Sequence, residues 1–304
     1  AIKQEGYKEK KKATFEKYNL DQNLPSDHEH LDVICKGRSY IELSNNYFHG
    51  MPPMTIYRHF ESIQYNPPFT KQTSSGEREL CKFLDEHGIT YQTNVRDVIC
   101  PLELDIYIPE YNLAIEYNGL YWHSFHDKNY HINKTQLCSN KGISLLQIFE
   151  DEWILKTDIV KSIILAKIGI FKERIYARKT VCQKVDKVLA KTFLDANHIQ
   201  GSISGDHYGL FVDTTLVAMV TVGTSRFGSG IELLRYCSLL GTQVVGGFSK
   251  LMVCIKLQYK TDIKTYADLR YSTGKTYYKF GEYSHTSKPS YYWVHKWKLH
   301  RINR

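Results

Sequence analysis

The sequence predicts a multidomain α+β protein: a helical N-terminal unit, a central α/β core and a second α/β domain at the C-terminal end. The length of 304 residues exceeds what a single hydrophobic core usually serves. Hydrophobic residues make up 42% of the chain and charged residues 24%, which is typical of globular proteins. Short apolar strand patterns alternate with helical periodicities in both the centre and the C-terminal part.

Residues 1–27 are predicted to form a basic arm with a helical pattern, and its lysines include Lys11 and Lys12. Such an arm can follow the backbone or groove of DNA, because its charge is complementary to phosphate. The alternative is a solvated helix without a partner, and the sequence favours neither.

Residues 28–66 are predicted to form a small helical unit whose second helix begins after a double proline, with Thr55 in its first turn. This arrangement resembles the helix-turn-helix pattern, in which the second helix enters the major groove of DNA. On this interpretation Thr55, Tyr57 and Arg58 contact bases or phosphates. The alternative is a helical hairpin that only packs against the next domain.

The central domain, residues 70–170, carries the most informative stretch of the chain. Asp105 opens one predicted strand and Glu116 ends the next, with a proline turn between them and His123 a few residues later. Two adjacent acids suit a hard cation such as Mg²⁺, which takes carboxylate oxygens and keeps several waters. A nearby histidine can move a proton close to neutral pH.

Six short blocks stand out in this domain, and their common order makes them specific where each alone is weak. They are Ser75-Gly76-Glu77, Glu103-Leu104-Asp105, Ile115-Glu116-Tyr117-Asn118-Gly119, Trp122-His123, Tyr130-His131 with Lys134-Thr135, and Ile148-Phe149-Glu150-Asp151-Glu152-Trp153. Together they resemble the nuclease domain of the very-short-patch-repair (Vsr-like) type. That domain is a branch of the restriction-endonuclease-like fold, which some phage homing endonucleases also use.

The resemblance implies a role for each matching residue. Asp105 would be the principal metal ligand and Glu116 the second acid, with Mg²⁺ or Mn²⁺ as the cofactor. Glu77, on the first helix of the domain, would face the same site. His123 would act as general base or hold a metal-bound water.

Two positions depart from the family pattern. Asn118 stands where a lysine is often found. The further aspartate of the family falls, by block spacing, at His131, with Lys134 one helical turn later. His131 could hydrogen-bond a water and Lys134 could hold a phosphate as a point charge, so both are candidates for the fourth catalytic residue.

The acids also have ordinary explanations. Asp105 and Glu116 would be unremarkable as solvent-facing strand ends. Glu150, Asp151 and Glu152 follow a predicted buried strand, and acids are favoured at the start of a helix by its dipole, whether or not they act in catalysis.

Residues 175–304 are predicted to form the second α/β domain. Strands are expected at 207–211, 215–222, 231–237 and 265–269, with helices at 184–197 and up to residue 260. This order resembles the acyltransferase-like fold of a phage DNA-modification family. In that fold a glycine-rich turn before a helix cradles the pyrophosphate of a cofactor through backbone N–H groups, and Gly241, Gly246 and Gly247 stand at that place.

Three interpretations of this domain stay open: an active transferase, a degenerate copy that binds DNA, and a structural module. We expect the second, because its aromatic and basic C-terminal end offers stacking and phosphate contacts. The basic residues with a predicted DNA contact are Arg226, Arg235, Arg270, Lys296 and Lys298.

The whole chain has a net charge of +8 and a pI near 8.9, which suits a polyanionic partner, here double-stranded DNA. Its seven cysteines form no CxxC pair, which indicates reduced thiols and a cytoplasmic setting, that of the host if the protein is phage-encoded. No apolar run reaches ~18 residues and no signal peptide is visible, so neither a membrane span nor a membrane partner is expected.

The leading expectation is a metal-dependent, site-targeting DNA endonuclease of the homing type. The runner-up among enzymes is a DNA-modifying acyltransferase-like protein with an appended nuclease, and the alternative from another class is a binding protein with an inactive nuclease core. A single catalytic domain that cuts both strands must either form a homodimer on DNA or act twice.

Overall fold

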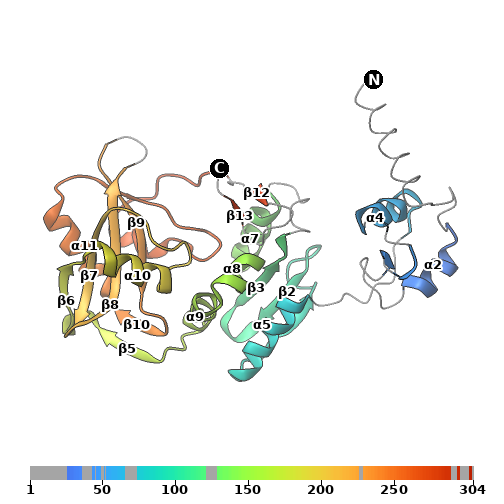
Figure 1. Ribbon diagram of the computed structural model, residues 1–304, viewed down its shortest axis with the longest axis horizontal. Coiled ribbons are helices and arrows are strands. Elements are labelled where there is room, and N and C mark those ends of the chain that lie inside the picture. The colour runs from blue at the N-terminus through green and yellow to red at the C-terminus, as the bar shows by residue number, and fades with distance from the viewer. Residues whose placement is uncertain are drawn as a thin grey trace. The chain divides into compact units, whose positions relative to one another are not determined.

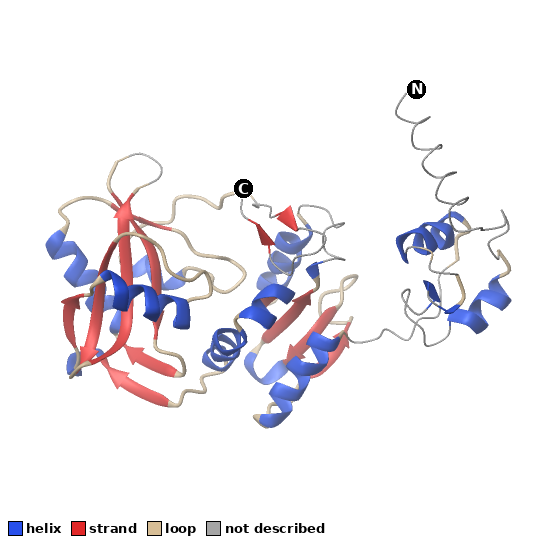
Figure 2. Cartoon of the chain, in the orientation of Figure 1, coloured by secondary structure: helices blue, strands red, loops and turns tan. Residues whose placement is uncertain are grey.

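The computed structural model describes residues 26–35, 43–44, 46–48, 51, 53–65, 74–120, 129–225, 229–288, 293–294 and 301–302. The chain forms two compact units, residues 1–78 and residues 79–304. Their helices and strands are drawn in Figures 1 and 2. Six predicted functional residues lie outside the described residues: Lys11, Lys12, His123, Arg226, Lys296 and Lys298.

The first unit contains the helices α2 (His28–Cys35) and α4 (Pro53–Ser62). Its core includes Leu31 and Phe60, both fully buried. The Tyr65 hydroxyl donates a hydrogen bond to Asp32 at 2.7 Å. The helical pattern predicted after the double proline is therefore present, and Thr55 lies half-buried in the first turn of α4. The side chains of Tyr57 and Arg58 lie outside the description.

The central part of the chain is built on a four-stranded sheet with the order β1-β2-β3-β4. The strands β1, β2 and β3 run antiparallel, and β4 is parallel to β3. In chain order the elements are α5 (Ser75–Glu86), β1 (Gln92–Val95), β2 (Leu104–Ile108), η1 (Pro109–Tyr111), β3 (Leu113–Asn118), α7 (Tyr130–Asn140), β4 (Ser144–Phe149), α8 (Glu150–Leu155) and α9 (Thr157–Lys167).

The predicted hairpin around the proline turn is present, and Asn112 closes it with a φ of 46°. One boundary was predicted wrongly. The strand β3 does not end at Ile115 but continues to Asn118, so Glu116 lies inside it. All six residues of β3 are buried, because this central strand is covered on both faces.

The two faces of the central sheet have different coverings. On one face Ile115 packs in a cluster with Leu84 of α5 and Ile164 of α9. On the other face Ala114 packs with Cys138 of α7. Because side chains alternate along a strand, Glu116 faces the same side as Ala114 and therefore faces α7.

The C-terminal part contains a five-stranded sheet with the order β11-β9-β8-β7-β6, in which only the β11–β9 pair is parallel. A separate parallel pair joins β10 to β5. The elements are β5 (Glu173–Tyr176), η2 (Ala177–Lys179), β6 (Val181–Lys184), α10 (Lys187–Asn197), β7 (Asp206–Val212), β8 (Thr215–Thr224), β9 (Ile231–Ser238), β10 (Thr242–Val245), α11 (Gly247–Gln258), β11 (Ile263–Thr265), η3 (Lys275–Lys279), β12 (Trp293–Val294) and β13 (Arg301–Ile302).

The predicted strands at 207–211, 215–222 and 231–237 are present as β7, β8 and β9, and the helix ending near residue 260 is α11. The strand predicted at 265–269 is wrong, since β11 covers only Ile263–Thr265. The sequence did not indicate β5, β6 or β10. These parts together give an α+β protein with several sheets, as predicted. None of the helices in the described residues combines the length and hydropathy needed to cross a bilayer.

Candidate functional site

The two predicted acids lie side by side on neighbouring strands of the central sheet. The backbone N–H of Asp105, on β2, donates a hydrogen bond to Oε1 of Glu116 at 3.1 Å. The N–H of Tyr117, on β3, donates in return to Oδ2 of Asp105 at 3.1 Å. Each carboxylate is thus fixed by the backbone of the other strand, and the hairpin register keeps the two groups together.

A lysine completes this group from the helix that covers the same face. The ammonium of Lys134, on α7, donates to Oε2 of Glu116. Both residues are only 3% exposed. Asp105, Glu116 and Lys134, here called the acid–lysine site, therefore combine two carboxylates with one cation.

The electrostatics of the pair follow from its burial. Desolvation, with a contribution from the neighbouring Asp105, raises the pKa of Glu116 to about 7, although Lys134 acts in the opposite direction. Burial by itself would lower the pKa of Lys134, but the charge and hydrogen bond of Glu116 outweigh it and leave that pKa raised. Lys134 therefore keeps its positive charge at neutral pH.

A buried glutamine holds α7 in place beside the acids. Gln147 is opposite Glu116 in the parallel β3–β4 register. Its Nε2 donates to the carbonyl oxygen of His131 and to Oγ1 of Thr135, both at 2.8 Å. These bonds fix the first turns of α7 on the sheet and so aim Lys134 at Glu116. Sequence reasoning missed Gln147, although one polar residue inside an apolar strand was a usable signal.

The two candidates for the fourth catalytic residue have different surroundings. The ring of His131 lies beside Phe149, with 5.6 Å between ring centroids, and beside Tyr130 at 5.4 Å. Lys134 contacts Glu116 directly, so the structure favours Lys134 as the member of the site. Asn118, which replaces the family lysine, is buried and donates to Oε1 of Gln147 at 3.5 Å.

Glu77 lies in the first turn of α5, where its N–H donates to Oγ of Ser74 at 3.1 Å. Its predicted place at the site remains a prediction, as does that of His123.

The donor set of the site fits a small hard cation. Magnesium is commonly held by one or two carboxylates and keeps several waters, and Asp105 and Glu116 supply two. Among the described residues, no group of three or more His, Cys, Asp and Glu side chains gathers as a metal cluster. The two acids therefore suit Mg²⁺ or Mn²⁺ better than a closed structural site for zinc.

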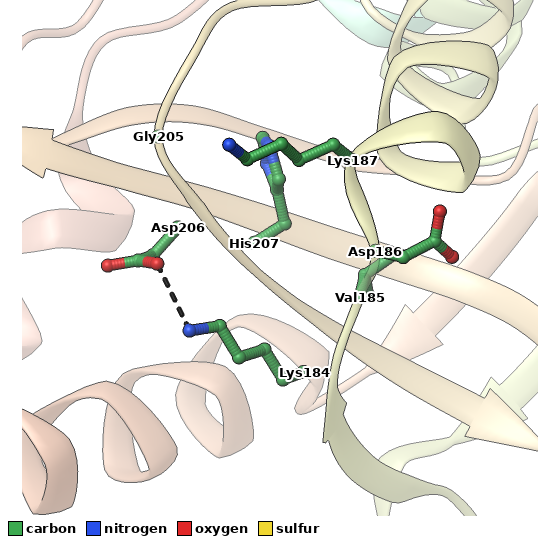
Figure 3. Close-up of a pocket in the computed structure, with 7 residues that line it drawn as sticks. All are labelled: Lys184, Val185, Asp186, Lys187, Gly205, Asp206 and His207. Atoms are coloured by element: carbon green, nitrogen blue, oxygen red, sulfur yellow. Dashed lines mark ion pairs between the residues drawn. The ribbon is translucent and has the colours of Figure 1, made fainter.

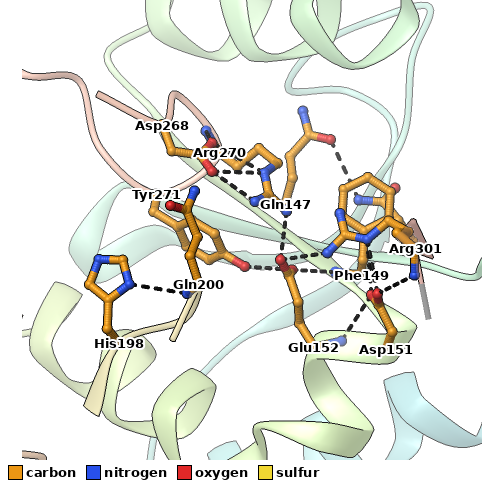
Figure 4. Close-up of polar contacts among 11 residues, drawn as sticks. Gln147, Phe149, Asp151, Glu152, His198, Gln200, Asp268, Arg270, Tyr271 and Arg301 are labelled. Atoms are coloured by element: carbon orange, nitrogen blue, oxygen red, sulfur yellow. Dashed lines mark hydrogen bonds and ion pairs between the residues drawn. The ribbon is translucent and has the colours of Figure 1, made fainter. Parts of the chain in front are cut away.

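The acids at the start of α8 are bound to residues from the C-terminal part, as Figure 4 shows. Glu152 accepts from Arg270 at 2.8 Å, from Arg301 at 2.6 Å and from the Tyr271 hydroxyl at 2.6 Å. Asp151 accepts from Nε of Arg301 at 3.1 Å. We call this group the α8 clamp. It gives Asp151 and Glu152 a structural role beyond helix initiation, so the catalytic interpretation of these acids is not favoured.

Contacts within the chain also change the interpretation of two predicted DNA contacts, Arg270 in the clamp and Arg235 outside it. Arg270 is bound to Asp268 as well as Glu152, and its side chain is only 18% exposed. Arg235 donates to the carbonyl oxygens of Leu234 at 2.8 Å and Gly201 at 3.3 Å. Both guanidinium groups thus serve contacts within the chain, and this placement favours a structural role over the predicted contact with DNA.

The glycine-rich turn of the C-terminal part has a packing explanation. A Cβ on Gly247 would lie 2.8 Å from Cγ1 of Val244, so only glycine fits there. Gly246 has a φ of 77°, which favours glycine. Lys250, in the first turn of α11, donates to the carbonyl oxygens of Ala177 and Thr180. The acyltransferase interpretation gains no support from this turn.

No protein-family model matches the chain, and no curated protein matches it. Among solved structures, the chain is similar to the catalytic domain of the homing endonuclease I-Bth0305I. The match is 32% identical and covers 31% of this chain and 93% of that domain, with a TM-score of 0.27. A TM-score this low carries no argument about activity, so the functional argument rests on the acid–lysine site.

Proposed function

We propose that the central domain hydrolyses phosphodiester bonds in double-stranded DNA with a divalent metal ion. One observation carries this proposal: Asp105 and Glu116 lie side by side, and the buried cation of Lys134 is bound to Glu116. Phosphodiester hydrolysis needs a held water and neutralisation of the negative charge that develops on phosphate. A pair of carboxylates with an adjacent lysine offers both functions in one place.

The residues divide this work by their chemistry. Asp105 and Glu116 would hold Mg²⁺ or Mn²⁺, which supplies Lewis-acid stabilisation and lowers the pKa of a bound water. Lys134 would place a compact positive charge beside the phosphate. Gln147 keeps α7 in the position that this requires. His123 remains our proposal for the base that takes a proton from the water.

The finer parts of the proposal concern targeting. We propose an endonuclease of the homing type, in which the helical unit at 28–66 and the C-terminal part select the site on DNA. The net charge of +8 supports DNA as the partner.

The decisive experiment is plasmid cleavage by the wild type and by Asp105→Asn, with Mg²⁺ and with EDTA. We expect cleavage only by the wild type with the metal ion, and a loss of at least 100-fold in Asp105→Asn, a magnitude typical for removal of an electrostatic catalytic group. Asp97→Asn is the matched control, because Asp97 is an exposed aspartate of the same domain. Equal cutting with EDTA, or by Asp105→Asn, would overturn the proposal. Intact DNA binding without cleavage would leave a binding protein with an inactive core.

A further inference from the structure

The positive charge of this chain is concentrated in the residues that follow the proposed catalytic domain in the sequence. Residues 79–171 contain 13 Asp and Glu against 8 Lys and Arg, a net charge of −5. Residues 172–304 contain 21 Lys and Arg against 9 Asp and Glu, a net charge of +12. The part that holds the acid–lysine site therefore repels a polyanion at long range. Attraction toward DNA has to come mainly from the C-terminal part.

Within the C-terminal part, Lys and Arg are most densely placed in one short segment. Residues 172–191 contain seven Lys and Arg and only two acids, and all seven cationic side chains are exposed. They are Lys172, Arg174, Arg178, Lys179, Lys184, Lys187 and Lys191. These twenty residues, which run from β5 through β6 into α10, therefore have a net charge of +5.

The end of this segment borders a hollow in the surface, shown in Figure 3. One cavity of about 480 Å³ is lined by Lys184, Lys187 and His207 together with the acids Asp186 and Asp206. A second, of about 290 Å³, is lined by Lys187, Lys191 and residues 202–205. Both share Lys187, Gly205 and His207, so they form one continuous hollow, which we call the β6–α10 groove.

The lysines of this groove are available to an anion. Lys187 forms no ion pair with any residue that the structure describes, and Figure 3 shows it among the residues that line the hollow. Lys184 is bound to Asp206 at 3.2 Å and Lys191 to Asp195 at 2.5 Å. The lysine side chains of these pairs are 67% and 70% exposed, and such exposed pairs contribute little stability. The ammonium groups therefore stay within reach of a phosphate from solvent, while Asp206 remains held by the Tyr259 hydroxyl.

Three other residues that line the groove, Asp186, Gly205 and His207, are fixed by contacts within the chain. The carboxylate of Asp186 accepts from the N–H groups of Val188 and Leu189 at 2.9 and 3.0 Å, and it points away from the groove in Figure 3. His207 is buried, with Nδ1 hydrogen-bonded to Oγ1 of Thr221 at 2.9 Å. A Cβ on Gly205 would lie 2.5 Å from the carbonyl oxygen of Val222, so the loop backbone lies directly on β8.

We propose that the β6–α10 groove binds backbone phosphates of DNA through Lys184, Lys187 and Lys191. This anchor lies outside the catalytic domain, and the proposal rests on DNA as the substrate of the acid–lysine site. Lysine ammonium groups are point charges that position a backbone without reading bases. The groove therefore supplies affinity that is independent of sequence, and it offsets the repulsion from the acidic central domain.

The test is duplex DNA binding in EDTA at a series of salt concentrations. Each phosphate contact contributes roughly 0.9 to the slope of log K against log salt. We expect the triple variant Lys184→Ala/Lys187→Ala/Lys191→Ala to lose about 2.7 of that slope and at least tenfold in affinity at 0.15 M salt. The matched control is Lys141→Ala/Lys260→Ala/Lys275→Ala, which removes the same charge from exposed lysines elsewhere. In this control the slope of log K against log salt should decrease by less than 1.

Two further variants keep the result interpretable. The triple lysine-to-arginine variant of the groove retains the charge and should bind as the wild type does. Lys187→Ala alone breaks no ion pair among the described residues and should lower the slope by about 0.9. Equal losses in the groove and control variants, or an unchanged slope in the groove variants, would overturn the anchor.

Failure of the anchor and failure of the nuclease give different results. A protein that binds DNA through the groove but does not cut it retains the anchor and loses the catalytic proposal. A protein that cuts DNA, while the groove variant binds as tightly as the wild type, retains the catalytic proposal and loses the anchor. Asp105→Asn should bind DNA in EDTA with the wild-type slope.

Discussion

Replacing Lys134 with methionine tests the acid–lysine site most directly. The substitution keeps roughly the length and volume of the side chain but removes its charge. Glu116 then remains buried at 3% exposure, next to Asp105, without its cationic partner. Breaking a buried ion pair by removing one partner typically costs about 3–5 kcal/mol. We expect a loss of that size in the free energy of unfolding at pH 8.

The pH dependence gives the sign of the effect. The pKa of Glu116 is raised from its ordinary value of 4.5 to about 7, so the folded protein holds a proton there that the unfolded chain releases. This group therefore lowers stability as the pH rises from about 4.5 through 7. Without Lys134 the pKa rises further. At pH 5.5 Glu116 is protonated in the folded state of both proteins, so the loss there should be smaller than at pH 8, by about 1.4 kcal/mol if the variant's pKa reaches 8.

The assay is urea unfolding of the wild type and Lys134→Met at pH 5.5 and pH 8, in EDTA. The double variant Lys134→Met/Glu116→Gln, which carries no charge at either position, should regain most of the stability lost at pH 8. It should nevertheless remain unable to cleave DNA, because the lysine and the carboxylate are both absent. The reasoning fails if the single variant loses the same free energy at both pH values, or if the double variant is as unstable as the single one.

Two other predictions come from the same residues. The affinity for Mg²⁺, measured by calorimetry, should fall roughly tenfold per pH unit below about 7, because the ion competes with the proton on Glu116; an affinity that stays constant from pH 8 to pH 6 would exclude Glu116 as a ligand. Gln147→Leu removes the donor to the Thr135 hydroxyl and one of the donors to the His131 carbonyl, and should cost about 1–3 kcal/mol in stability and change kcat more than KM. The control is Gln136→Leu, at an exposed position of α7, the helix that Gln147 holds. An equal effect of Gln136→Leu would exclude a positioning role for Gln147.

The position of the acid pair could be predicted from the sequence because the signals for it are local. Alternating apolar residues around Pro109 indicate a hairpin, and a hairpin with a short turn fixes which residues lie opposite each other. Asp105 and Glu116 therefore meet as predicted by the pattern. The end of β3 was predicted wrongly because Glu116 and Asn118 are polar, and polar residues normally indicate a strand end. Here they are buried and paired with Lys134 and Gln147 instead.

The partners of the acids, Lys134 and Gln147, could not be predicted in this way. Spacing left His131 and Lys134 as alternatives, since it does not give the rotation of α7 on the sheet. That rotation is fixed by Gln147, which comes from another strand.

The strands β5 and β10 were missed for a related reason. They pair in parallel although about 65 residues of sequence separate them, and three of the four residues of β5 are exposed. No alternating pattern can form in so short and exposed a strand, so the signal lies only in the tertiary contact.

The α8 clamp shows how the C-terminal part is connected to the acid–lysine site. Arg301 lies over the ring of Phe149, with 4.0 Å between its guanidinium carbon and the ring centroid, at the end of β4. The carbonyl oxygen of Arg270 accepts from the backbone N–H of Gln147 at 3.3 Å, on the outer edge of that strand. The side chain of the same Gln147 holds α7, which carries Lys134.

Gln147 thus contacts the C-terminal part through its backbone N–H and, through its side chain, the helix α7 that carries Lys134. Removing the C-terminal part would take away the arginines that pair with Asp151 and Glu152 and would expose both carboxylates to water. It would also leave the N–H of Gln147 without the Arg270 carbonyl. The position of Lys134 beside Glu116 is therefore supported by residues of the C-terminal part, which belongs to the same compact unit as the central sheet.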